Sequence, residues 1–117
     1  MSSIAVDSSG NVFAVVGMFF NVELDEIAYT NGTYSNTPTT LTNAFARING
    51  VAVDRTGNVF FGDAGHGTVQ EFVLTNGSYG ATPVTVSTGY QNLEYLAIDS
   101  HGRVYVGDIA DLKVLTP

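Results

Sequence analysis

The chain has 117 residues, of which 44% are apolar and 13% charged, and its formal net charge is −7. This balance excludes a disordered polyelectrolyte and fits one domain or part of one. The lack of Cys excludes disulfides, thiolate metal sites and thiol nucleophiles. The chain has only 4 Lys and Arg residues in total, too few to form the basic face that binds nucleic acid.

Three segments of the chain repeat one pattern. Residues 4–13, 51–60 and 96–105 align, so the second segment starts 47 residues after the first and the third starts 45 residues after the second. Each is a predicted strand, an Asp-x-x-Gly turn and the start of another strand. The Asp carboxylate accepts backbone N–H bonds across such a turn, and the Gly takes the positive φ. We therefore assign a structural role to six turn residues: Asp7, Gly10, Asp54, Gly57, Asp99 and Gly102.

The other predicted strands follow in the same order in each repeat. In the first they cover residues 11–16, 22–30 and 39–42, and in the second 58–62, 69–75 and 84–87. In the third they cover 103–107 and 112–115. The dipeptides Asn31-Gly32 and Asn76-Gly77 predict type I′ hairpin turns. No window carries a sustained helical period, so no substantial helix is predicted.

Units of about 45 residues with four antiparallel strands are typical of β-propeller blades. The pattern Val-Ala-Val-Asp-x-x-Gly-Asn-Val-Phe-x-Gly-Asp at 51–63, repeated with changes at 96–108, resembles the NHL repeat. That resemblance implies a propeller and says little about function. The first repeat departs from it, because Val16 stands where Asp63 and Asp108 stand in the others.

The fold class predicted is therefore an all-β propeller segment of about three four-stranded antiparallel blades. Their bounds are about 4–50, 51–95 and 96–117, and the last blade lacks its outer strand. Propellers close with about four to eight blades, and an open arc leaves two apolar faces in water. We expect a homodimer of two times three blades that forms a six-bladed ring. The alternative is a piece of a longer propeller.

No catalytic residue, metal site or cofactor is predicted. His66 and His101 fall in turns at opposite ends of the strands, so they cannot share a zinc ion within one chain. Asp25, Glu26 and Glu71 lie on or beside the third strands, away from the propeller axis, and no nucleophile elbow occurs. We therefore predict that the protein is not an enzyme.

The remaining prediction is a recognition surface on one face of the disc, formed by the loops that connect the second to the third strand and one blade to the next. It would bind a protein, peptide or glycan. Two alternatives stay open: a hydrolase or lyase whose metal-assisted site forms only in the assembled ring, and an excised or engineered fragment without a ligand. The candidate contact residues are Met18, Phe19, Phe20, Arg47, His66, Tyr95 and Asp111.

Location in the cell is weakly constrained. The turns rich in Ser, Thr, Asn and Gly favour a secreted or cell-surface bacterial protein, although no export signal is seen. No apolar run approaches the roughly 20 residues that span a bilayer, so we predict no membrane partner.

Overall fold

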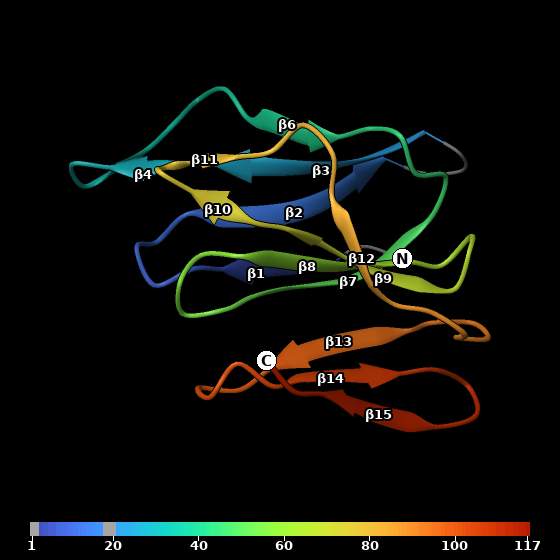
Figure 1. Cartoon of the computed structure of the whole chain (residues 1–117). Helices are drawn as coiled ribbons and strands as arrows, with labels where there is room; N and C mark the ends of the chain where they lie inside the picture. The colour runs from blue at the N-terminus through green and yellow to red at the C-terminus, as the bar shows by residue number, and fades with distance from the viewer. Residues whose placement is uncertain (1–2, 18–20) are drawn as a thin grey trace.

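The structure is a computed structural model that describes residues 3–17 and 21–117. Across these residues every regular element is a β-strand, and the strands form three stacked antiparallel sheets and two small hairpin sheets (Figure 1). None of the described residues belongs to a helix that is long and apolar enough to cross a bilayer. The predicted fold class, an all-β propeller segment, is confirmed.

Each sheet is one blade, and its first strand in the chain is an edge strand that lies beside the neighbouring blade. The inner strands β1 (Ile4–Val6) and β13 (Tyr95–Ile98) both contact β7 (Ile48–Val53), which places blade 2 between the others. Blade 1 has the order β1 (Ile4–Val6), β2 (Val12–Gly17), β3 (Val22–Ile27) and β6 (Thr39–Thr42). Blade 2 has β7 (Ile48–Val53), β8 (Val59–Asp63), β9 (Thr68–Phe72) and β12 (Val84–Ser87). Blade 3 has β13 (Tyr95–Ile98), β14 (Val104–Gly107) and β15 (Leu112–Leu115).

Two small hairpins extend from blades 1 and 2 as separate two-stranded sheets. They are β4 (Tyr29–Thr30) with β5 (Thr33–Tyr34), and β10 (Leu74–Thr75) with β11 (Ser78–Tyr79). The Asn of each turn has φ of 52° and the following Gly has φ of 82°, both positive as a type I′ turn requires. The sequence predicted one strand over 22–30 and one over 69–75, whereas the structure divides each into a blade strand and a hairpin strand.

The Asp-x-x-Gly turns carry the hydrogen bonds that their sequence suggests. Asp54 Oδ1 accepts from the backbone N–H groups of Thr56 and Asn58, both at 2.9 Å. Asp7 makes the equivalent bonds in the first turn and Asp99 in the third. The turn glycines all have a positive φ between 82° and 93°, so a side chain at these positions would strain the backbone.

The core lies between the blades, because alternate residues of each strand point to opposite faces of its sheet. One buried cluster joins blades 1 and 2 and is centred on Phe13, Leu24, Phe61 and Phe72. A second joins blades 2 and 3 and contains Phe60, Val69, Tyr90, Leu93, Val104 and Val106. Blade 2 is therefore apolar on both faces, whereas, among residues 3–17 and 21–117, each end blade contributes one face to these clusters.

Candidate functional site

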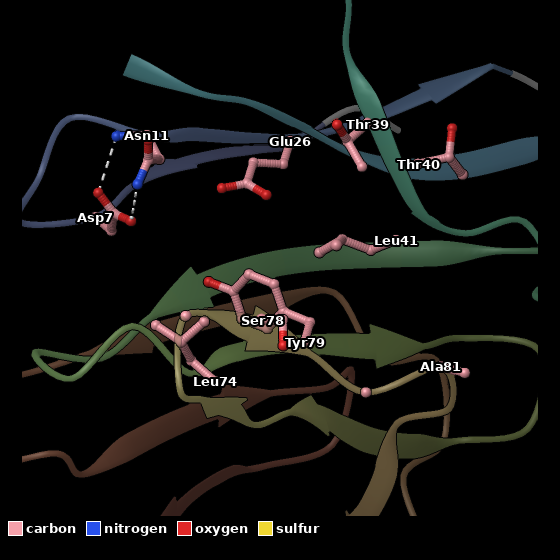
Figure 2. Close-up of a pocket in the computed structure, with 12 residues that line it drawn as sticks. Asp7, Asn11, Glu26, Thr39, Thr40, Leu41, Leu74, Ser78, Tyr79 and Ala81 are labelled. Carbon is pink, nitrogen blue, oxygen red and sulfur yellow. Dashed lines mark hydrogen bonds between the residues drawn. The ribbon is translucent and has the colours of Figure 1, made fainter. Parts of the chain in front are cut away.

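A groove of about 600 Å³ lies between blades 1 and 2 (Figure 2). Blade 1 forms one wall with its first turn, β3 and β6. The opposite wall is the β10–β11 hairpin of blade 2, which reaches across to blade 1 (Figure 1). The lining residues used below are Asp7, Asn11, Glu26, Thr39, Ser78 and Tyr79.

The Asp7 turn forms a fixed end of this groove. Asp7 Oδ1 accepts from Ser9 N at 2.9 Å and Asn11 N at 2.8 Å, and Oδ2 accepts from Asn11 Nδ2 at 2.9 Å. Asn11 Oδ1 then accepts the backbone N–H of Tyr29 at 2.8 Å. The Asp7 carboxylate is therefore held in one orientation by donors, and it places a negative charge at the end of the groove.

Tyr79 connects the two walls of the groove. Its ring packs edge-on against Phe13 of blade 1, with centroids 5.9 Å apart and an interplanar angle of 88°. Its hydroxyl donates to Gly57 O of blade 2 at 2.7 Å. Burial raises the pKa of the Tyr79 hydroxyl, and the nearby carboxylates, Glu26 first, raise it further. Tyr79 therefore stays neutral and presents an aromatic surface to the groove.

Of the ionisable side chains that line this groove, Asp7, Glu26 and Tyr79, Glu26 alone makes no hydrogen bond to another described residue. It lies on β3 opposite Phe13 of β2, half-buried, with its carboxyl group between the Asp7 turn and Tyr79 (Figure 2). Burial raises the pKa of the Glu26 carboxyl above its usual 4.5, and the charge of Asp7 raises it further. A carboxyl group in this state both accepts and releases protons closer to neutral pH than a free Glu does.

Blades 2 and 3 form a smaller version of the groove, with a volume of about 280 Å³. Glu71 and Asp54 take the places of Glu26 and Asp7, and the pKa of Glu71 is raised by burial first and by Asp54 second. In blade 3 the pattern ends: Arg103 replaces the Asn and donates its Nε–H to Asp99 Oδ2 at 2.6 Å. The acid pair therefore occurs twice, and the larger groove holds the first pair.

Glu26→Gln should raise the melting temperature at pH 7. Because the folded-state pKa lies above the unfolded value, ionising Glu26 costs folding stability, and this cost appears as the pH rises through the raised pKa. Below about pH 4 both states bind the proton, and the difference between variant and parent should vanish. Thermal melts of both proteins from pH 3 to pH 8 measure this difference in melting temperature. A variant less stable than the parent at pH 7 contradicts this reading of Glu26.

The contact residues predicted from sequence fall into separate places. Met18, Phe19 and Phe20 lie outside the described residues. The loops of Arg47 and His66 adjoin, because Ala64 N donates to Arg47 O at 3.1 Å, and His66 Nδ1 lies 2.9 Å from Asp63 Oδ2.

Tyr95 and Asp111 are exposed on blade 3. Tyr95 stands opposite Gly107 on β14, and Asp111 O accepts from Asp108 N at 3.0 Å. Neither groove described above is lined by Arg47, His66, Tyr95 or Asp111. Within residues 3–17 and 21–117, no three His, Asp or Glu side chains are grouped so that they could hold a metal ion.

The sequence suggested Asp25 and Glu26, or Glu71, as the source of a carboxylate pair, but it placed neither Glu26 nor Glu71 beside its actual partner. The partner is the turn Asp of the same blade, which follows the first strand and comes near only through the register of the sheet. One signal was present, because Glu26 and Glu71 are 45 residues apart and so occupy equivalent positions in the repeat.

The groove combines chemistry that suits a polyhydroxylated ligand. Carboxyl and hydroxyl groups from Glu26, Thr39 and Ser78 offer both donors and acceptors, and Asp7 adds a fixed negative charge. The Tyr79 ring, together with leucine side chains, offers apolar surface for C–H groups. Pockets of this kind fix a ligand by few polar contacts on a largely apolar surface.

Comparison with known proteins identifies the fold. No protein-family model matches the chain, and no curated protein matches it. Among solved structures, a protein assigned the name gluconolactonase aligns with a TM-score of 0.70 and 15% identity over 97% of this chain and 43% of its own. The PQQ-bound form of an aldose sugar dehydrogenase from Streptomyces coelicolor aligns with a TM-score of 0.62 and 16% identity over 97% and 41%. The chain therefore spans less than half the length of both.

These comparisons define a propeller segment, and they correct one prediction. Both similar structures carry the names of enzymes, which overturns the prediction that the protein is not an enzyme. The prediction was based on two His at opposite strand ends and on carboxylates away from the axis, whereas a propeller can also assemble functional groups from separate strands between its blades.

Proposed function

We propose that this chain is part of a propeller enzyme that acts on a sugar or a sugar lactone. The groove between blades 1 and 2 would hold the substrate, and Glu26 would transfer the proton. The names of the two similar structures support a sugar substrate. The proposal keeps the glycan ligand predicted from the sequence but moves it from the loops to the groove. The repeated motif at 51–63 and 96–108 supports placing the propeller among those of the NHL type.

One observation carries this proposal: Glu26, with its pKa raised by burial and by Asp7, faces a groove of about 600 Å³ lined with hydroxyl groups. A general base works best when its pKa lies near the working pH. Asp7 contributes by its fixed negative charge, because its oxygens are already occupied by N–H donors. Thr39 and Ser78 would orient the substrate hydroxyl groups from opposite walls.

The chemistry for a lactone needs no group beyond these side chains and water. The Glu26 carboxylate accepts a proton from a water molecule as the water oxygen forms a bond to the lactone carbonyl carbon. The bond between that carbon and the ring oxygen then breaks, and Glu26 returns the proton to the ring oxygen. The product is an open-chain hydroxy acid, and Glu26 is again ionised.

Hydrolysis of glucono-1,5-lactone tests the proposal. We expect the protein to accelerate hydrolysis above the rate in buffer, and Glu26→Gln to lose about a hundredfold or more of that acceleration. The rate should rise with pH through the raised pKa of Glu26, because the ionised form is the base.

Glu71→Gln is the matched control. It removes the equivalent carboxyl from a groove with less than half the volume, so the rate should remain that of the parent. Equal loss in both variants, or hydrolysis no faster than in buffer, contradicts the proposal. If Glu26→Gln also raises the melting temperature at pH 7, its lost activity does not come from unfolding.

A further inference from the structure

We propose that two copies of this chain close head to tail, with the free face of blade 3 packed on the free face of blade 1 of the second copy. The two free faces carry different residues. Each is the counterpart of a face that is already buried inside the chain, and this equivalence supports a second copy as the occupant.

The free face of blade 1 repeats the face by which blade 2 packs on blade 1. Ile4 is equivalent to Val51, and Val6 to Val53, by the alignment of the repeats. Ile4 is 68% exposed, whereas Val51 is 5% exposed inside the blade 1–blade 2 cluster. A β-branched residue that is buried in one repeat and bare in another marks a missing neighbour.

The free face of blade 3 is equivalent to the face by which blade 1 packs on blade 2. Leu112 stands opposite Gly107 as Leu24 stands opposite Val15. Leu24 is fully buried, whereas Leu112 is 64% exposed. Tyr105 takes the place of Phe13 in the repeat, and it lies on this same face because Phe13 is opposite Ala5 and Tyr105 is opposite Ala97.

The two free faces therefore match each other as the buried faces do. Inside the chain, residues of the Leu24 type pack on residues of the Val51 type in one cluster. The described part of the chain carries one unpaired face of each type, on blade 1 and on blade 3. Two copies pair both faces and leave no free end, and the chain covers 43% and 41% of the two similar propellers, so two copies approach a whole ring.

The junction would also complete a third groove that one chain cannot form. The β4–β5 hairpin is the counterpart of β10–β11, and Tyr34 is the counterpart of Tyr79. Tyr34 is 53% exposed within one chain. In the ring it would lie over Asp99 and Tyr105 of the other copy, as Tyr79 lies over Asp7 and Phe13.

Sedimentation equilibrium on single and mixed variants tests this arrangement. The parent should have twice the chain mass of 12.4 kDa at micromolar concentration. Ile4→Lys alone and Leu112→Asp alone should each weaken association by about tenfold or more, because each places a charge in both junctions. An equimolar mixture of the two variants should associate more tightly than either alone, since one junction is then unaltered and the other pairs Lys with Asp.

Other outcomes overturn the proposal. A parent that stays monomeric leaves the faces for another part of a longer chain, and larger oligomers mean that the junction does not close after two copies. If only one variant affects the mass, the junction joins like faces.

Val84→Asp, at a site 55% exposed on the outer edge of blade 2, is the control and should not change the mass. Circular dichroism confirms that each variant is folded. Because both copies carry a charge of −7, added NaCl should tighten the dimer.

Discussion

Phe61→Ala should destabilise the fold by about 3–5 kcal/mol, a large part of the net stability of a small domain. The Phe61 side chain is fully buried in the cluster between blades 1 and 2. Its ring lies edge-on to Phe45 at 5.1 Å and stacks on Phe72 at 5.7 Å. Truncation would leave a cavity between two sheets, and sheets joined by ladders of hydrogen bonds close such a space poorly.

Urea denaturation measures this loss as a lower midpoint at an unchanged slope. Val84→Ala is the control, because Val84 is 55% exposed and its truncation should change stability by less than about 0.5 kcal/mol. A midpoint shift for Phe61→Ala no larger than that of the control means that blades 1 and 2 do not pack as described.

The repeat carried most of the information about the fold. Because residues 4–13, 51–60 and 96–105 align, each uncertain strand is supported by two others, and period-two alternation then assigns its buried face. The blade 2 residues Phe60 and Phe61 show that the alternation assigns even adjacent residues to the correct face of the sheet. They are neighbours on β8, yet Phe60 belongs to the cluster with blade 3 and Phe61 to the cluster with blade 1.

The divided third strands could not be predicted in the same way. In a continuous strand, the N–H of Tyr29 would bond along the blade ladder, but Asn11 Oδ1 accepts it. Asn58 Oδ1 does the same for Leu74 N at 2.9 Å. A side-chain amide that is distant in sequence thus takes over a backbone donor, and the chain turns away into the hairpin. Local propensity contains no trace of such a bond.

The pairing of carboxylates in the candidate site could not be predicted from the sequence, for a related reason. The sequence placed Asp25 beside Glu26, which suggests a pair, but adjacent strand residues point to opposite faces. Asp25 stands opposite Ala14 and Glu26 opposite Phe13, so only Glu26 faces blade 2. The charge that acts on Glu26 belongs to Asp7, two strands away. Register decides such pairs, and register is known only once the sheet is formed.

Asp54→Ala should destabilise the fold by about 2–3 kcal/mol, because one carboxylate organises the whole turn between β7 and β8. Its Oδ1 accepts from Thr56 N, Thr56 Oγ1 and Asn58 N, and its Oδ2 accepts from Asn58 Nδ2 at 2.9 Å. Without it, Asn58 is free to rotate, and the bond from Leu74 N to Asn58 Oδ1 that positions the β10–β11 hairpin is lost as well.

Asp54→Asn separates the contribution of the hydrogen bonds to backbone N–H groups from the contribution of the carboxylate charge. The amide oxygen can still accept from the backbone N–H groups of Thr56 and Asn58, so this variant should lose less than Asp54→Ala, about 1 kcal/mol. Amide hydrogen exchange adds a local measure: Leu74 N–H should lose protection in Asp54→Ala and keep most of it in Asp54→Asn. Because the hairpin carries Tyr79, Asp54→Ala should also open the groove wall that faces Glu26. Unchanged protection at Leu74 together with lost stability would mean that the turn acts on blade 2 alone and does not position the groove.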